Sequence, residues 1–233
     1  MTDEMAEHRR LEGRLGYRFR DRELLARALT HASARDGHNE RLEFLGDAVL
    51  NLVVAEALFR TLPDKREGRL TELKALLVSR DTLERVAMRL GLADFVRTGG
   101  SLAERGSVPR SVLGNALEAL LGALYLDAGN AAGLEIAGRA ALAWLQPEMA
   151  RLETEHARAR AKSKLQAWAQ RAHGCLPEYH LLETFVHPEA HAFQVAAVAA
   201  GRRFPAAWAS TKKEAERLAA WEALLVVQGG RPR

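Results

Sequence analysis

The stretch that decides the fold is HNERLEFLGD at residues 38–47, which continues as the apolar run AVLNLVVAEALF to Phe59. Read as one helix, it places Glu40, Glu43 and Asp47 at i, i+3 and i+7, so that three carboxylates share one face. An adjoining face repeats at the same period and predicts packing into a core through Leu42, Leu45, Val49 and Leu52.

Three carboxylates on one face oppose folding, because like charges at this spacing destabilise a helix by about a few tenths of a kcal/mol per pair. A hard cation such as Mg²⁺ would compensate that repulsion. A solvated acidic surface is the alternative, and the spacing alone leaves both interpretations open.

A second polar pair lies in the segment 111–127, which is otherwise almost wholly apolar. Asn115 and Glu118 stand at i and i+3 in this predicted helix. Because an unpaired buried carboxylate is very costly, Glu118 should face a partner or a metal ion. It could also lie at the rim of a core helix and accept a hydrogen bond from a backbone N–H.

Taken together, these stretches resemble ribonuclease III, the endonuclease of double-stranded RNA. The likeness runs through five stretches and covers about the whole chain: LTHAS at 29–33, HNERLEFLGD at 38–47, EG at 67–68, LVS at 77–79 and EA at 118–119. It implies hydrolysis of phosphodiester bonds in RNA duplexes to 5′-phosphate and 3′-hydroxyl ends, as in the processing of RNA, including ribosomal RNA.

The resemblance also implies a site. Mg²⁺, with Mn²⁺ as a possible substitute, would be held by Glu43, Asp47, Asn115 and Glu118. Asp47 and Glu118 would act in catalysis, while Glu40 and Glu67 would position the strand or the outer water. Phe44 corresponds to a residue that inserts into the other subunit of a symmetric dimer, which predicts a homodimer with one site per subunit.

One position departs from the family, because Asn115 stands where a metal-binding Asp is usual. An amide offers one oxygen and no charge, so the site has about one unit less negative charge. Three functions stay open at this point. They are an active nuclease with three carboxylates, a catalytically silent protein that binds double-stranded RNA, and a helical metal protein unrelated to RNA.

We predict a multidomain chain whose first part, residues 1–148, is an all-α nuclease domain. Helical periodicity covers residues 11–15, 22–29, 40–60, 69–78, 80–90, 111–125 and 131–145, with Glu67 in a turn before the fourth of these helices. Pro147 is expected to end the last helix. A short, partly helical linker is expected over residues 149–161.

Residues 162–230 are predicted to form a small α+β domain of order α-β-β-β-α. The helices cover 164–172 and 211–225, and the strands cover 178–185, 193–198 and 203–208. This order resembles a double-stranded RNA-binding domain, which reads phosphates and 2′-hydroxyls by shape. The resemblance places Gln166 and His191, the latter in the first hairpin link, at minor-groove hydroxyls. Lys212 and Lys213, at a helix N-terminus, are predicted to bind phosphate.

Composition agrees with such a chain: 48% of its residues are hydrophobic, 27% are charged, and the formal net charge is +4. Residues 151–233 carry 13 Lys and Arg against 8 Asp and Glu, so the excess of positive charge lies in the rear part. A single cysteine, Cys175, excludes a disulfide framework. We expect no secretory signal, no membrane association and no small-molecule organic cofactor, and hence a cytoplasmic protein.

Overall fold

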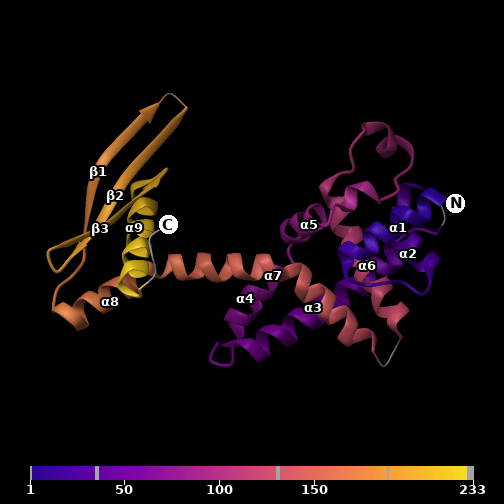
Figure 1. Cartoon of the computed structure of the whole chain (residues 1–233), viewed down its shortest axis with the longest axis horizontal. Coiled ribbons are helices and arrows are strands. Elements are labelled where there is room, and N and C mark those ends of the chain that lie inside the picture. The colour runs from indigo at the N-terminus through magenta and orange to yellow at the C-terminus, as the bar shows by residue number, and fades with distance from the viewer. Residues whose placement is uncertain (1, 35–36, 130–131, 188, 230–233) are drawn as a thin grey trace. The chain divides into compact units, whose positions relative to one another are not determined.

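The computed structural model describes residues 2–34, 37–129, 132–187 and 189–229 of the 233-residue chain. Its residues divide into two compact units, Met1–Met149 and Ala150–Arg233 (Figure 1). We describe each unit by itself. None of the helices among the described residues combines the length and the apolar character needed to cross a membrane.

The first unit is all-α, as predicted. Its helices are α1 (Thr2–Leu15), α2 (Arg22–Ala28), α3 (Glu40–Thr61), α4 (Glu67–Leu77), α5 (Arg80–Arg89), α6 (Arg110–Ala128) and the part of α7 (Gly133–Ala159) up to Met149. Three short 3₁₀ turns, η1 (Ala32–Ala34), η2 (Leu92–Asp94) and η3 (Gly100–Arg105), lie in the connections.

The core of this unit is built around α6, which is apolar nearly all round and therefore buried nearly all round. Its buried positions run from Val112 to Leu124 and are interrupted by Asn115 and Glu118. Helix α3 packs along it through a buried face that includes Leu42, Val49, Leu50, Val53, Val54 and Leu58. The two helices therefore carry both the core and the polar residues that interrupt it.

Two glycines allow α3 and α6 to touch at the level of their backbones. A Cβ at Gly46 of α3 would overlap the carbonyl oxygen of Glu118, and a Cβ at Gly122 of α6 would overlap the carbonyl oxygen of Leu42. Because neither residue has a side chain, the helices approach more closely than two ordinary helices do, whose axes lie about 8–10 Å apart. The side chains next to the glycines are consequently brought together.

The second unit has the predicted order α-β-β-β-α. It comprises α8 (Ala161–His173), β1 (Glu178–His187), β2 (Ala190–Ala199), β3 (Arg202–Ala209) and α9 (Lys212–Val227). The strands form an antiparallel sheet in the order β1-β2-β3, and β1 and β2 extend beyond β3 as a hairpin (Figure 1). The turn between β2 and β3 consists of Ala200 and Gly201, both at positive φ, as a type I′ turn requires.

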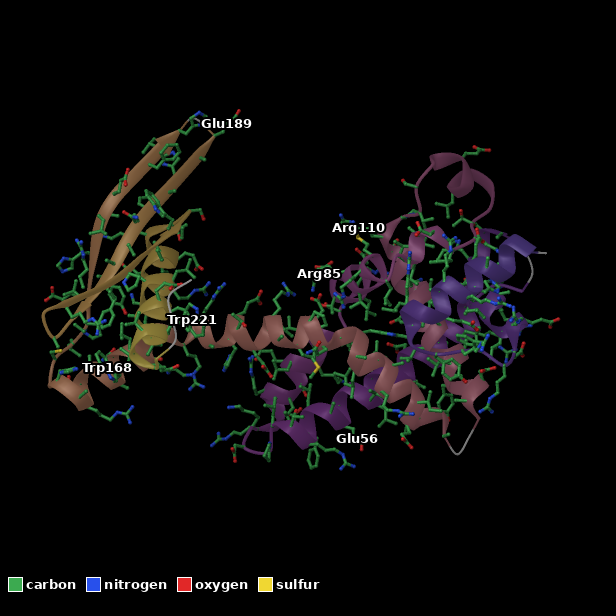
Figure 2. All side chains as sticks on the ribbon, in the orientation of Figure 1. Glu56, Arg85, Arg110, Trp168, Glu189 and Trp221 are labelled. Atoms are coloured by element: carbon green, nitrogen blue, oxygen red, sulfur yellow. The ribbon has the colours of Figure 1, made fainter. Side chains whose placement is uncertain are left out.

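Both helices of the second unit cover one face of the sheet. The core there joins Leu165 of α8, Val195 of β2, Phe204 of β3 and Leu224 of α9, all at most 4% exposed. Trp168 and Trp221, labelled in Figure 2, pack on this core from α8 and α9. Lys162 Nζ lies 2.8 Å from Glu216 Oε2 and thereby ties α8 to α9.

The prediction that Pro147 ends a helix is wrong, because α7 continues through it to Ala159. Proline removes one backbone hydrogen bond, but the residues on either side of it are held by α5. Arg89 donates to the carbonyl of Trp144, while Arg85 and Arg89 bind Glu148, which is only 6% exposed. Helix α8 follows at Ala161, so the residues expected to form a linker are almost entirely helical.

Other boundaries also differ. α1 begins at Thr2 rather than near Leu11, and Glu67 is the first residue of α4 rather than part of a turn. His191 lies in β2 opposite Val186, not in the hairpin link, since cross-strand pairing continues almost to the tip. Leu52 is 53% exposed, because the buried face of α3 passes through Val53 instead. The predicted start of the helix at Ala131 lies outside the described residues.

Candidate active site

The crossing of α3 and α6 brings together four of the residues singled out in the sequence: Glu43, Asp47, Asn115 and Glu118. On α3, Glu43 lies one turn before Gly46 and Asp47 directly follows it, and Gly46 rests on the backbone of Glu118. The charges of Asp47 and Glu43 both act on Glu118, and Asn115 donates a side-chain hydrogen bond to the Glu43 carboxylate. We call these four residues the carboxylate cluster.

Glu118 is the most strongly perturbed acid of the cluster. Burial disfavours its charged form, and the negative charges of Asp47 and Glu43 add to this, so that its pKa rises to about 7. The guanidinium of Arg80 acts in the opposite direction. A carboxyl group that folding makes difficult to ionise is a position where a bound cation would be favourable.

Asn115 changes the electrostatics of Glu43. Burial raises the pKa of Glu43, the hydrogen bond from Asn115 lowers it, and the charge of Glu40 raises it again, with a net upward shift. An aspartate at position 115 would repel Glu43, whereas the amide N–H stabilises its charged form. Asn115 thus relieves part of the repulsion that its neighbours create.

Asp47 is held in place by Asn51, one turn further along α3. The side-chain amide of Asn51 donates to Asp47 Oδ1 at 2.8 Å and to the Asp47 carbonyl oxygen at 3.0 Å. The sequence interpretation missed Asn51. The i, i+4 spacing of an acid and an amide was the signal that could have revealed it.

The donor set fits a hard divalent cation, because its ligand atoms would be three carboxylates and one amide oxygen. Within the part of the chain that the structure describes, no three His, Cys, Asp or Glu side chains are already gathered around one point. The cluster therefore has the chemistry of a metal site without the tight convergence that a bound ion produces.

The other two predicted acids are placed differently. Glu40 is exposed at the start of α3, where its Oε2 lies 3.5 Å from Nδ1 of His38, and its charge reaches Glu43. Glu67, at the start of α4, accepts a hydrogen bond from Thr71 at 2.7 Å and lines a separate groove beside Phe59. It is not among the groups whose charges act on Glu118.

Phe44 projects from α3 and is 81% exposed, the largest exposed fraction among the large apolar side chains of the described residues. It borders a groove of about 790 Å³ that is also lined by Leu24, Leu45 and Leu126. Burying an exposed phenyl ring is strongly favourable. An exposed ring beside an apolar groove is a surface suited to a partner.

The residues predicted to contact RNA are all exposed on the second unit. Gln166 lies on α8, His191 near the tip of the β1–β2 hairpin, which Glu189 marks in Figure 2, and Lys212 and Lys213 at the start of α9. Thr211 caps α9 by accepting from the Glu214 N–H. Neither lysine forms an ion pair within the described residues, so both ammonium groups are available to a phosphate.

Two family models match the chain, one for each unit. Residues 21–145 match the model described as ribonuclease-III-like, and residues 161–227 match the double-stranded RNA binding motif. The first match covers more than half of the chain.

Curated relatives and solved structures agree with the family models. Ribonuclease 3 of Pseudomonas fluorescens (strain SBW25) is 45% identical over 188 residues, and Ribonuclease 3 of Pseudomonas aeruginosa (strain LESB58) is 43% identical; each match covers 80% of both chains. Two structures of the nuclease domain of ribonuclease III from Campylobacter jejuni are 42% identical, with TM-scores of 0.55 and 0.56. They cover 59% and 60% of this chain and 95% and 94% of theirs, and one describes structural flexibility in a region involved in dimer formation.

Proposed function

The chain belongs to the ribonuclease III family, and on that premise we propose that it is an endoribonuclease that hydrolyses phosphodiester bonds of double-stranded RNA at the carboxylate cluster. The observation that carries this proposal is the glycine-mediated contact of α3 with α6, which gathers the acids of two distant stretches. The same chain carries a double-stranded RNA binding motif. The products would be 5′-phosphate and 3′-hydroxyl ends.

Glu43, Asp47, Glu118 and the amide oxygen of Asn115 would hold Mg²⁺, for which Mn²⁺ could substitute. Such an ion, when bound, lowers the pKa of water and offsets negative charge on the reacting phosphate. Asn51 orients Asp47 through its two hydrogen bonds. Glu40 and Glu67 would position the strand or the outer water, Glu40 beside the cluster and Glu67 from α4.

The functional unit would be a homodimer. Phe44 and the groove beside it lie on one surface, so a two-fold axis could place each ring in the groove of the other subunit. The dimer-forming region described for the Campylobacter jejuni nuclease domain supports this assembly. Two sites, one per subunit, could then cut both strands of a duplex.

The second unit would hold the duplex through Gln166, His191, Lys212 and Lys213. Contacts to phosphates and 2′-hydroxyls make binding depend on the A-form shape of the duplex rather than on base sequence. We propose that the substrates are folded RNA precursors in the cytoplasm, including those of ribosomal RNA.

The decisive experiment is cleavage of an end-labelled RNA duplex with Mg²⁺ or Mn²⁺ by the parent chain, Glu118→Gln and Asn115→Asp. Glu135→Gln, an exposed acid on α7, serves as the matched control. We expect the parent and Glu135→Gln to cut and Glu118→Gln to bind without cutting. Binding without cutting by the parent, with activity only in Asn115→Asp, would contradict the proposal and identify a silent RNA-binding protein.

A further inference from the structure

Arg80 is a cation beside the carboxylate cluster that the sequence interpretation did not single out. Its positive charge acts on both Glu43 and Glu118, so the guanidinium lies within electrostatic reach of acids on two different helices. The side chain itself is exposed. It therefore stands where the cluster meets solvent.

The packing of α5 on α6 explains this position. A Cβ at Gly114 would lie 3.6 Å from Glu84 Cγ and 3.9 Å from Leu83 Cβ, so the first turns of α5 rest on α6 at the residue next to Asn115. Leu83 and Glu84 follow Arg80 at i+3 and i+4 and share its side of the helix. The start of α5 is thus directed toward the cluster by the packing of α5 on α6, independently of any charge on Arg80.

Nothing in the structure of α5 itself explains why position 80 carries an arginine. Arg80 follows the N-cap Ser79, where the positive end of the helix dipole disfavours a cation. Arg85 and Arg89 on the same helix bind Glu148, and Figure 2 labels Arg85 there. Within the described residues, the Arg80 side chain forms neither a hydrogen bond nor an ion pair. Its N–H donors are therefore available to a ligand.

We propose that Arg80 binds a non-bridging phosphate oxygen of the RNA strand that lies across the carboxylate cluster, and is therefore a further substrate-binding residue of the cleavage site. This inference rests on the proposed function, since it requires RNA at the cluster. A phosphodiester that approaches three carboxylates is repelled, and a guanidinium beside them offsets that repulsion. Its paired N–H groups match two phosphate oxygens, which a lysine ammonium does not do.

The test compares the parent with Arg80→Gln, Arg80→Lys and the matched control Arg22→Gln. Arg22 is also exposed and also the first residue of a helix, after the N-cap Asp21, but its charge acts on neither Glu43 nor Glu118. Binding of a duplex in EDTA is measured over a range of salt concentrations, and single-turnover cleavage is measured with Mg²⁺.

We expect Arg80→Gln to reduce the slope of log K against log salt by about one, as the loss of one phosphate contact does, and to slow cleavage about tenfold. Arg80→Lys should keep the slope and recover only part of the rate. Arg22→Gln should change neither quantity. A parental slope in Arg80→Gln overturns the proposal, whatever its cleavage rate.

The location of the phosphate is tested with a duplex that carries uncharged methylphosphonates at the cut positions. The parent and Arg80→Gln should bind this duplex equally, and a remaining difference would overturn the assignment to the cleaved phosphate. If the parent binds RNA but never cuts it, the proposed function fails. In that case the salt dependence of duplex binding still tests, independently of cleavage, whether Arg80 contacts a phosphate.

Discussion

Gly46 of α3 rests directly on the backbone carbonyl of Glu118 in α6, and no side chain lies between them. This contact sets the distance between the acids of the two helices. The carboxylate cluster is therefore a consequence of a backbone contact, and its geometry depends on a residue that carries no chemistry itself.

We predict that Gly46→Ala destabilises the first unit by about 2–3 kcal/mol, because the methyl group would push two packed backbones apart. Gly13→Ala is the control, since nothing lies within 4 Å of a Cβ there and alanine favours the helix by up to about 1 kcal/mol. Urea unfolding of both variants gives the comparison. Equal stability of Gly46→Ala and the parent would contradict the close contact.

The raised pKa of Glu118 gives a prediction about stability and pH. Its folded pKa of about 7 exceeds the ordinary value of 4.5, so ionisation weakens the fold progressively as pH rises from about 4.5 through 7. Glu118→Gln removes that penalty. In EDTA at pH 8 we expect it to be more stable than the parent by about 1–2 kcal/mol after allowance for solvent screening.

At pH 4 Glu118→Gln and the parent should unfold at the same urea concentration, because Glu118 is then protonated in both the folded and the unfolded state. Glu135→Gln should match the parent at both pH values. A Glu118→Gln variant that is less stable at pH 8 would show that the carboxylate stabilises the metal-free fold.

Asn115→Asp should have opposite effects on the metal-free and the metal-bound protein. It replaces the hydrogen bond to Glu43 with repulsion, so we expect lower stability in EDTA at pH 8. It also adds a charged ligand, so the affinity for Mn²⁺, measured by calorimetry without RNA, should rise about tenfold. Unchanged affinity would mean that position 115 does not face the ion.

Much of the fold followed from periodicity. Helices α3 and α6 were predicted from long, largely apolar stretches with helical spacing, and the three strands from short segments separated by hairpin links. Pro147 misled the prediction because its local cost is offset by Arg85 and Arg89, which are more than 55 residues away in sequence. Leu52 was assigned to the wrong face, since a helix buried on more than one side does not show which apolar residue stays exposed.

The acids of the site were named because they stand in stretches that resemble a known family, and the structure brings three of them together with Asn115. The residues that support these acids were not predicted from the sequence. Gly46 acts by lacking a side chain, Asn51 by a hydrogen bond within its own helix, and Arg80 by the packing of α5 on α6. Each of these roles depends on a tertiary contact or a rotamer that a pattern of residue types does not contain.

Asp127, near the end of α6, fastens the segment between α1 and α2. Its carboxylate accepts from the Tyr17 hydroxyl at 2.7 Å and from the backbone N–H groups of Arg20 and Asp21 at 2.9 and 2.7 Å. Burial raises the pKa of Asp127, but these donors and the charge of Arg20 lower it by a larger amount, so the net shift is downward. The charged carboxylate therefore stabilises the fold.

Asp127→Asn should destabilise the protein by about 1–3 kcal/mol at pH 7, because an amide cannot satisfy all these donors. The contribution of Asp127 is present above its unfolded pKa, near 3.8, and is lost as pH falls through the lower folded pKa. Thermal unfolding at pH 7 and pH 3 measures this, with the exposed Asp94→Asn as control. A difference that stays constant with pH would contradict the role of the charge.

Phe44→Ala tests the dimer. The ring is 81% exposed in the single chain, so its removal should leave the intrinsic stability of the unit unchanged while weakening association. In sedimentation equilibrium we expect the parent to be a dimer at micromolar concentration and Phe44→Ala to dissociate at least tenfold more readily. Leu176→Ala, which removes a 62% exposed side chain from the second unit, should remain as dimeric as the parent. A dimer equally strong in Phe44→Ala would show that the subunits meet through another surface.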